Sequence, residues 1–479
     1  MATPRPPQPT PQDVLRRLPP VNEALAARTP DDLAYASHDE WVEETRRALA
    51  EVRAAILSGE MGAVGAGRAG LASALLASAR KRIARRRDPG LVRVVNATGV
   101  VLHTNLGRAP LPPAALEALA RHGAGYQLLA ADRETGERAP RERHVDALLR
   151  RLTGAQAVTT VNNNAAATMI VLAAMAAGKE VVVSRGQLVE IGGAYRIPDV
   201  MAMSGAVLRE VGTTNRTHLR DYEKAIGPDT GLLLRVHTSN YRVVGFQGEV
   251  PLEDLVALGR AHGVPVADDL GSGALVSLTE QGLALDEPLV RSSLEAGADL
   301  VTASGDKLIG GPQMGLVLGS AEAVARVRAH PLYRAVRCDK LKLIAMEATL
   351  RLFLHPERLA ETHPTWAALT AKGPALRARA EALLPRVRAA VPTWSAEVVE
   401  VVDAVGAGSL PTVELPGFAV RLAAPGIEAG TLSARLRAAA TPVFTTVSDG
   451  HVHLHVRTLL PDDDAALLAA LTSAARPPS

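Results

Sequence analysis

The regular alternation of short β-branched runs with helix-length segments between residues 91 and 334 constrains the fold of this chain most. The runs that are typical of strands are 157–161, 180–184, 231–238, 264–268 and 299–302. Helical patterns lie between them, for example at 165–177 and 252–262. Strands that alternate with helices indicate a mainly parallel sheet covered by helices on both faces. We therefore predict an α/β fold for this region.

Different patterns flank the α/β region. From Val14 to about Arg87 the spacing of apolar residues is helical, and Ser37 with Glu40 predicts a capping box at a helix start. After about residue 335, long helical stretches come first. The segments that then follow read as strands at 412–415, 442–447 and 451–456 and as a helix at 432–439.

A chain of 479 residues with 47% hydrophobic content can bury more than one core. We predict a helical domain at 1–90, in which the first dozen Pro-rich residues are disordered. A large α/β domain is expected at 91–335 and a smaller α+β domain at 336–479. No internal repeat is evident.

The composition excludes several classes of protein. No apolar stretch reaches the length of a membrane span, and the start of the chain lacks a signal peptide's apolar core, so we expect a cytoplasmic protein. One cysteine, Cys338, excludes an internal disulfide or a thiolate metal cluster. His451, His453 and His455 alternate as metal ligands could, but no partner carboxylate is evident. We interpret them as structural and expect no metal.

Lys307 is the first candidate for a chemical role. The chain has only seven lysines, and this one lies in Ser304-Gly305-Asp306-Lys307, after a predicted strand and before a Gly-Gly-Pro turn. A lysine that forms a Schiff base with pyridoxal phosphate (PLP) needs such a setting, and the hydroxyl of Ser304 could bond the cofactor phosphate. A surface lysine in a hairpin loop would also account for this segment alone.

An acid and an anion cradle complete the requirements of PLP chemistry. Asp268 and Asp269 follow a predicted buried strand, where open α/β sheets place ligands, and a carboxylate there could keep the pyridine nitrogen protonated. Successive side chains on a strand point in opposite directions, so only one of the two can serve. We favour Asp269, although an acidic pair at a strand end is more often a cap or turn.

The segment Asn162-Asn163-Asn164 connects a predicted strand to a helix. Free backbone N–H groups and the dipole at a helix start suit a phosphate, and the asparagine side chains add donors. We therefore predict that these three residues bind the cofactor phosphate. Simple helix capping is the alternative, but it needs only one asparagine.

Five segments together carry a resemblance to a known family. They are Val94–Ala109, Asn162–Ala167, Ser184–Gly193, Asp269–Gly273 and Ser304–Gly311. This series resembles the bacterial selenocysteine synthases, the L-seryl-tRNA(Sec) selenium transferases, and the similarity extends from Leu18 into the C-terminal region. A Pro-rich leader, Met314 and Cys338 depart from the family pattern.

The resemblance implies a PLP-dependent enzyme of the aspartate aminotransferase-like fold, fold type I. Such an enzyme converts L-seryl-tRNA(Sec) to L-selenocysteinyl-tRNA(Sec) with selenophosphate as the selenium donor. It forms a PLP aldimine with the serine, loses water to give aminoacrylyl-tRNA and adds selenium. Lys307 is then both the cofactor anchor and the base for the Cα proton.

The resemblance also assigns the anion site and the partners. Arg108, Arg334 and Arg337 occupy the positions that bind the selenium donor, and His103 lies in a matched motif where it could approach the cofactor. The helical N-terminal domain would contact tRNA, in part through six cations among residues 80–87, although such runs are often solvated helix faces. The family assembles as a ring of dimers, a homodecamer.

Two alternative functions stay open at this point. One is a PLP-dependent eliminase or dehydratase of a free amino acid or amino sugar acid, which would share the lysine loop. The other is a non-catalytic tRNA-binding scaffold. The N-terminal domain argues against the first, and the presence of Lys307, Ser304 and Asp269 argues against the second.

Overall fold

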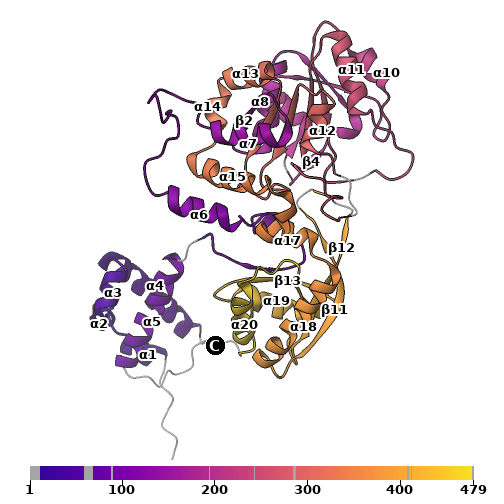
Figure 1. Cartoon of the computed structure of the whole chain (residues 1–479). Helices are drawn as coiled ribbons and strands as arrows, with labels where there is room; N and C mark the ends of the chain where they lie inside the picture. The colour runs from indigo at the N-terminus through magenta and orange to yellow at the C-terminus, as the bar shows by residue number, and fades with distance from the viewer. Residues whose placement is uncertain are drawn as a thin grey trace, which may run out of the picture. The chain divides into compact units, whose positions relative to one another are not determined.

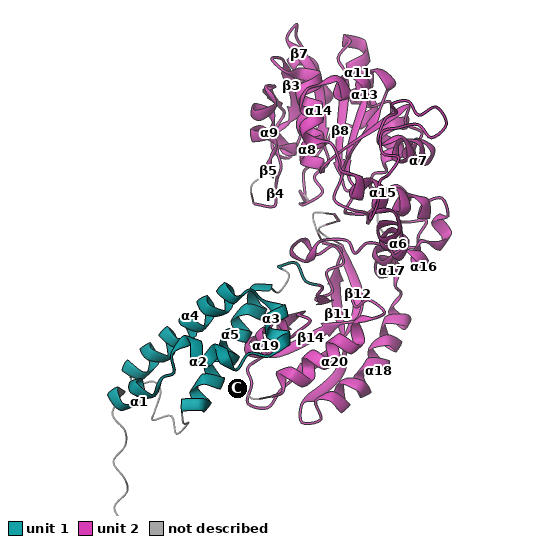
Figure 2. Cartoon of the chain, turned by 90° about the vertical axis from the view of Figure 1, so that its left-hand side faces the viewer, with its two compact units in different colours: residues 1–92 teal, residues 93–479 magenta. Residues whose placement is uncertain are grey.

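The computed structural model describes residues 11–58, 68–87, 90–193, 195–241, 243–283, 287–406, 409–410 and 413–476. The chain divides into two compact units, residues 1–92 and residues 93–479 (Figure 2). Each unit has hydrophobic clusters of its own. None of the helices in the described ranges combines the length and apolar character that a membrane span requires.

The first unit consists of helices α1 (Pro11–Arg17), α2 (Val21–Ala26), α3 (Pro30–Tyr35), α4 (His38–Leu57) and α5 (Arg68–Arg87). The capping box predicted at Ser37 is confirmed, because its hydroxyl accepts from the backbone N–H of Glu40 and its own N–H donates to the Glu40 carboxylate. Helix α1 begins at Pro11, inside the segment predicted to be disordered. Residues 1–10 lie outside the described residues.

The two long helices of this unit pack face to face through apolar side chains. Trp41 on α4 is fully buried against Ile83 on α5, and its indole N–H donates to the Asp32 carbonyl at 2.9 Å. Trp41, Thr45, Leu49 and Ile56 of α4 recur at helical spacing and are all buried, so they form one stripe along this helix. The unit therefore has a core of its own.

The second unit contains a seven-stranded sheet with the strand order β2-β10-β9-β8-β7-β3-β6. In Figure 1 this sheet lies in the part of the unit where β2 is labelled. The strands are β2 (Ala157–Val161), β3 (Glu180–Ser184), β6 (Val207–Val211), β7 (Thr230–Val236), β8 (Val266–Gly271), β9 (Leu300–Ser304) and β10 (Gly315–Gly319). Neighbours from β9 to β6 are parallel, and β10 is antiparallel to both of its neighbours. The predicted α/β class with a mainly parallel sheet is confirmed.

Helices cover both faces of this sheet. One face packs against α8 (Asn164–Ala176), α9 (Ile197–Ser204) and α13 (Ala321–Ala329). The other packs against α7 (Arg143–Thr153), α10 (Leu219–Ala225), α11 (Leu252–His262), α12 (Val290–Glu295) and α15 (Lys340–Leu352). The strands are buried on both faces, which explains their continuous apolar runs.

Strand β10 was not expected from the sequence. Its five residues, Gly-Leu-Val-Leu-Gly, are all buried. A Cβ on Gly315 would clash with the Asn163 carbonyl, and one on Gly319 would clash with the Asp299 carbonyl. The glycines therefore allow the backbone of β10 to approach its neighbours, although they read as turn residues in the sequence.

A smaller five-stranded sheet has the order β1-β13-β14-β12-β11. Its strands are β1 (Val95–Ala97), β11 (Ser395–Ala404), β12 (Glu414–Ala423), β13 (Val443–Ser448) and β14 (His451–His455), and helices α18 (Gly373–Ala390), α19 (Ala429–Arg437) and α20 (Asp463–Ala474) pack with it. Part of the predicted strand at 412–415 lies outside the described residues, and β12 begins at Glu414.

The hydrophobic clusters show how the chain is shared between the two sheets. Met346 and Trp366 belong to the core of the large sheet, whereas most buried apolar residues from Leu376 onward belong to the second core. Val405, Leu410 and Leu415 are exceptions that belong to the first core. Strand β1 pairs with β13 of the small sheet although it precedes the large sheet in sequence. The domain limits drawn from the sequence stay a prediction.

A buried ion-pair network holds the small sheet together. Asp403 on β11 is 2% exposed, and its carboxylate contacts His455 Nδ1 at 2.7 Å and Arg457 Nε at 2.8 Å. His455 Nε2 lies 2.8 Å from the Thr446 hydroxyl. Arg457 also donates to the Ala368 carbonyl. The histidine that the sequence suggested as structural thus has a carboxylate partner from a distant strand.

We expect Asp403→Asn to destabilise the fold, because it leaves the buried Arg457 without a counter-charge. The loss should be about 3–5 kcal/mol in the free energy of unfolding. Glu397→Gln is the control, because Glu397 pairs with Arg421 on the solvent-exposed surface of the same sheet and its loss should leave the stability nearly unchanged. Thermal and urea unfolding measure both, and equal losses would contradict the assignment.

Candidate active site

The carboxyl ends of β2, β7, β8 and β9 meet at one edge of the large sheet, and the residues predicted to carry chemistry follow these ends. Lys307 lies in the turn after β9, and its side chain is almost completely buried, with 5% of the residue exposed. Burial lowers the pKa of Lys307, and the positive charge of Arg108 lowers it further, while Asp269, Asp306 and Glu287 oppose the shift. A lowered pKa increases the neutral, nucleophilic form of the amine.

The two aspartates at the end of β8 have different surroundings. Asp269 Oδ1 accepts from Asn164 Nδ2 and from the Thr302 hydroxyl, both at 2.8 Å, and Oδ2 accepts from Thr168 at 3.2 Å. These partners come from α8 and β9. The carboxylate is therefore fixed in place by three donors at the sheet edge.

Asp268 points the other way, as strand alternation requires. It is fully buried, accepts from the Ser293 hydroxyl at 2.7 Å and pairs with Arg235 at 3.2 Å. Burial raises its pKa, and Arg235 opposes that shift. Because Asp269 and not Asp268 acts electrostatically on Lys307, the geometry favours Asp269 as the acid for a cofactor.

The three side chains of the asparagine segment, residues 162–164, make different contacts. Asn163 caps α8, because its Oδ1 accepts from the Ala166 N–H at 2.9 Å, so the capping alternative applies to this residue. Asn162 accepts from Lys342 Nζ at 3.3 Å. Asn164 holds Asp269, and its buried Oδ1 has no hydrogen-bond partner in the described structure. The predicted phosphate role thus depends mainly on the backbone N–H groups at the start of α8.

The surroundings of Lys307 fit PLP. Gly271 has a positive φ of 67°, and a Cβ there would lie 3.7 Å from Lys307 Nζ and 3.7 Å from the Ser239 hydroxyl oxygen, so the glycine keeps space open beside the amine. Ser272 is fully buried with no hydrogen-bond partner for its hydroxyl among the described residues. Ser304 is buried at the end of β9. Open space, a fixed acid and a spare donor suit a planar phosphorylated cofactor.

The three predicted anion-site arginines lie in two places. Arg108 adopts a left-handed backbone with φ of 63° and donates to Asp306 at 2.8 Å, directly beside Lys307. Arg337, which follows α14 (Leu332–Val336), forms a backbone bridge with Val161 at the end of β2. Arg334 lies exposed on α14. The structure therefore brings Arg108 to the lysine and Arg337 to the asparagine segment.

His103 forms a backbone bridge with Arg108, which places it in the same amino-terminal segment of the site. Burial lowers its pKa, and its Nδ1 is buried without a hydrogen-bond partner in the described chain. A neutral imidazole in this position can accept or donate one hydrogen bond to a bound group.

Sequence reasoning missed a large polar cavity at the same sheet edge, which we call the edge cavity. Its volume is about 1060 Å³, and its wall includes Gln187, Arg216, His237, Ser239 and Glu287. His237 follows directly on β7, and its backbone N–H donates to the backbone carbonyl of Asp269 at 2.9 Å. Its position at the carboxyl end of a predicted strand was the signal available in the sequence.

Comparison with known proteins decides the family. The model of the L-seryl-tRNA selenium transferase family matches residues 94–460. The chain belongs to this family.

Relatives within the L-seryl-tRNA selenium transferase family match this chain along nearly its whole length. The L-seryl-tRNA(Sec) selenium transferase of Nitratidesulfovibrio vulgaris is 47% identical over 96% of this chain and 99% of its own. That of Moorella thermoacetica is 44% identical over 97% of both chains. The match includes the first unit, so the helical N-terminal part is shared with these relatives.

A solved structure supports the fold. A D-glucosaminate-6-phosphate ammonia-lyase covers 81% of this chain and 96% of its own, with a TM-score of 0.55 and 20% identity. At this identity the likeness concerns the fold alone. It agrees with a fold-type I assignment for this transferase family member.

The two aspartates should respond differently to substitution. Asp269→Asn should weaken PLP binding by roughly tenfold to a hundredfold, because it removes the charged hydrogen bond that we predict between Asp269 and the ring nitrogen. Asp268→Asn should leave PLP affinity nearly unchanged and lower the free energy of unfolding by roughly 2 kcal/mol, because Arg235 loses its partner. Absorbance titration with PLP and thermal unfolding separate the two effects. The reverse pattern would assign the cofactor to Asp268.

Proposed function

We propose that this chain converts L-seryl-tRNA(Sec) to L-selenocysteinyl-tRNA(Sec) with selenophosphate as the selenium donor and PLP as the cofactor. The observation that carries the proposal is the buried Lys307 beside the fixed carboxylate of Asp269, in a chain of the L-seryl-tRNA selenium transferase family. Relatives that match nearly the whole chain carry this activity in their names.

PLP bound at Lys307 supplies an electron sink for charge that develops at the serine Cα. Lys307 would hold the cofactor through Nζ, and its lowered pKa would suit the same atom to take the Cα proton of the serine. Asp269 would hold a proton at the pyridine nitrogen. The carboxylate is kept in position by Thr302, Thr168 and Asn164.

The selenium donor is a polyanion that needs fixed cations. Arg108, Arg334 and Arg337 are the residues we assign to it, because guanidinium groups stay charged and bind oxyanions with two parallel N–H donors. Arg108 is oriented by Asp306, the residue that precedes Lys307. The donor is thereby brought next to the carbon that it must reach.

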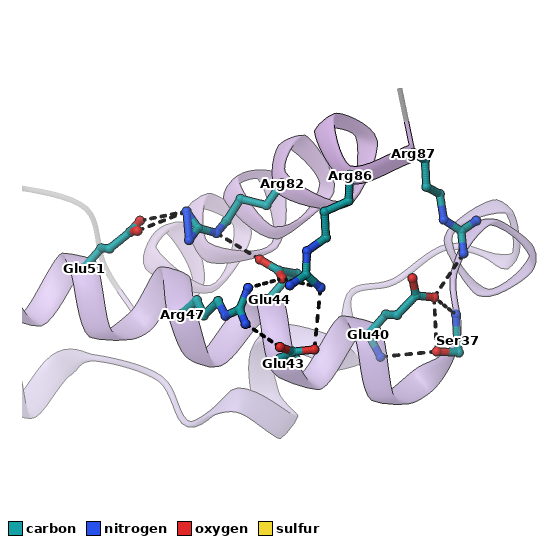
Figure 3. A network of polar contacts seen from close by, with 9 residues as sticks. All are labelled: Ser37, Glu40, Glu43, Glu44, Arg47, Glu51, Arg82, Arg86 and Arg87. Atoms are coloured by element: carbon teal, nitrogen blue, oxygen red, sulfur yellow. Dashed lines mark hydrogen bonds and ion pairs between the residues drawn. The ribbon is translucent and has the colours of Figure 1, made fainter. Parts of the chain in front are cut away.

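The structure narrows the set of cations among residues 80–87 that could contact tRNA. Four arginines at the end of α5 are paired with acids on α3 and α4. Figure 3 shows three of them, Arg82, Arg86 and Arg87, with Glu44, Glu43 and Glu40 among their partners. Arg80 pairs with Asp32. These arginines hold helices together, so much of the basic run is neutralised within the unit.

Lys81 and Arg85 are the exposed cations of the run for which the described residues provide no ion-pair partner. Their spacing of four residues places them on one face of α5. We assign the phosphate contacts of this helix to these two side chains. Contacts of this kind supply affinity without reading sequence.

We also propose that the chain self-associates, as the decameric ring of dimers expected from the family resemblance requires, and that it works in the cytoplasm, where charged tRNA is used. Val244 and Phe246 support self-association, because each is 88% exposed at the tip of a loop in the isolated chain. Exposed apolar side chains that are close together favour burial against a partner surface.

Lys81→Ala with Arg85→Ala should weaken tRNA binding about tenfold. The slope of log affinity against log salt should fall by roughly 2, because two phosphates are no longer neutralised by the protein. Arg87→Ala is the matched control, since it removes one charge from the same helix end but from a side chain paired with Glu40. It should leave the salt slope unchanged. Filter binding at several salt concentrations measures this, and equal slopes for all variants would contradict the assignment.

The activity is tested with purified protein, seryl-tRNA(Sec), selenophosphate and PLP, with selenocysteinyl-tRNA as the measured product. We expect product with the unaltered chain and a loss of at least about a hundredfold for Lys307→Ala, the range that a positioned acid or base contributes. Turnover of a free amino acid or amino sugar acid without this product would favour the eliminase. Tight tRNA binding without any turnover would favour the scaffold.

A further inference from the structure

A buried carboxylate and an imidazole face each other in the edge cavity, and the mechanism above uses neither. The Glu287 side chain is 3% exposed, and its Oε1 has no hydrogen-bond partner in the described structure. His237 Nε2 lies 3.5 Å from this oxygen. A buried carboxylate without donors is unfavourable unless a cation or a bound group compensates it. The closest cationic or donor group to this oxygen that the described structure provides is the His237 imidazole.

The pair lies close to the amine of Lys307. His237 follows β7, the strand next to β8, and its backbone N–H donates to the backbone carbonyl of Asp269. Ser239, two residues further on, shares with Lys307 Nζ the space that Gly271 leaves open. The negative charge of Glu287 also acts on the Lys307 ammonium. His237, Ser239 and Glu287 all line the edge cavity, and Ser239 connects its wall to the space beside Lys307 Nζ.

The proposed reaction needs an acid that has not been assigned. The serine β-oxygen leaves as water, and hydroxide is a poor leaving group, so the oxygen must receive a proton as its bond to Cβ breaks. Lys307 takes the Cα proton, and the ammonium that results is the competing acid, which undiminished turnover of the seryl substrate without His237 would favour. The arginines cannot supply a proton, because a guanidinium does not give one up in a protein.

We propose that His237 is the catalytic acid that protonates the leaving β-hydroxyl, and that Glu287 is the positioning residue that holds its Nε2–H. The proposal rests on the function proposed above. The Cβ–O bond breaks, its electron pair stays on oxygen, and the proton of His237 Nδ1 completes the water molecule. His237 is left neutral and regains a proton from solvent in the edge cavity.

Substrates with different leaving groups can distinguish an acid role of His237 from a purely structural role. Chloride needs no proton, so β-chloroalanyl-tRNA(Sec) bypasses the acid, whereas seryl-tRNA(Sec) depends on it. His237→Gln should form selenocysteinyl-tRNA about a hundredfold more slowly from the seryl substrate and within about threefold of normal from the chloroalanyl substrate. Glu287→Gln should show the same selectivity with a loss of about tenfold.

Glu249→Gln is the matched control, because Glu249 also lines the edge cavity but is exposed. It should change neither rate. PLP affinity, measured by absorbance titration, should be unchanged in His237→Gln, because an acid directed at the substrate does not hold the cofactor.

Equal losses on both substrates, or weakened PLP binding in His237→Gln, would overturn the inference and assign the pair to cofactor placement or to the fold. Undiminished turnover of the seryl substrate would overturn it as well. Failure of the unaltered chain to use seryl-tRNA(Sec) would instead overturn the proposed function, and the inference with it. The unaltered chain therefore distinguishes the two failures.

Discussion

The burial of the Lys307 amine at the carboxyl edge of the large sheet is the constraint on which the site depends. An ammonium in this position is disfavoured by desolvation and by the neighbouring Arg108, while the carboxylates of Asp269 and Asp306 limit the shift in its pKa. This balance produces an amine that can be neutral and reactive although its surroundings are polar. Arg108, Asp269 and the turn that carries Asp306 and Lys307 come from three separate segments, so the balance requires that the fold bring them together.

The parallel sheet explains how the groups meet. Strands β2, β8 and β9 bring the asparagine segment, Asp269 and Lys307 to the same edge, although these segments are far apart in the chain. Thr302 on β9 and Asn164 on α8 then hold Asp269 from two sides. On the opposite face, the pairing of Asp268 with Arg235 and Ser293 secures the strand from which Asp269 projects. Asp268 thus stabilises strand β8, which positions the side chain of Asp269.

The fold class and the positions of most strands could be predicted from the sequence, because the parallel strands are continuous apolar runs bounded by helices. Strand β10 could not, since its glycines are required by close backbone contacts that only the assembled sheet creates. In the candidate site, Lys307 and Asp269 could be proposed from the sequence because they follow predicted strands, and the structure places both at the same sheet edge. Glu287 and the pairing of the α5 arginines were missed, because they depend on contacts between distant segments.

Borohydride reduction of the purified PLP-loaded protein, followed by digestion and mass spectrometry, tests the central assignment most directly. Reduction fixes the cofactor on the lysine that carries it. We predict a phosphopyridoxyl group on the peptide that contains Lys307. Modification of Lys342 instead, whose Nζ lies 3.0 Å from the Asn162 carbonyl near the predicted phosphate position, would contradict the assignment.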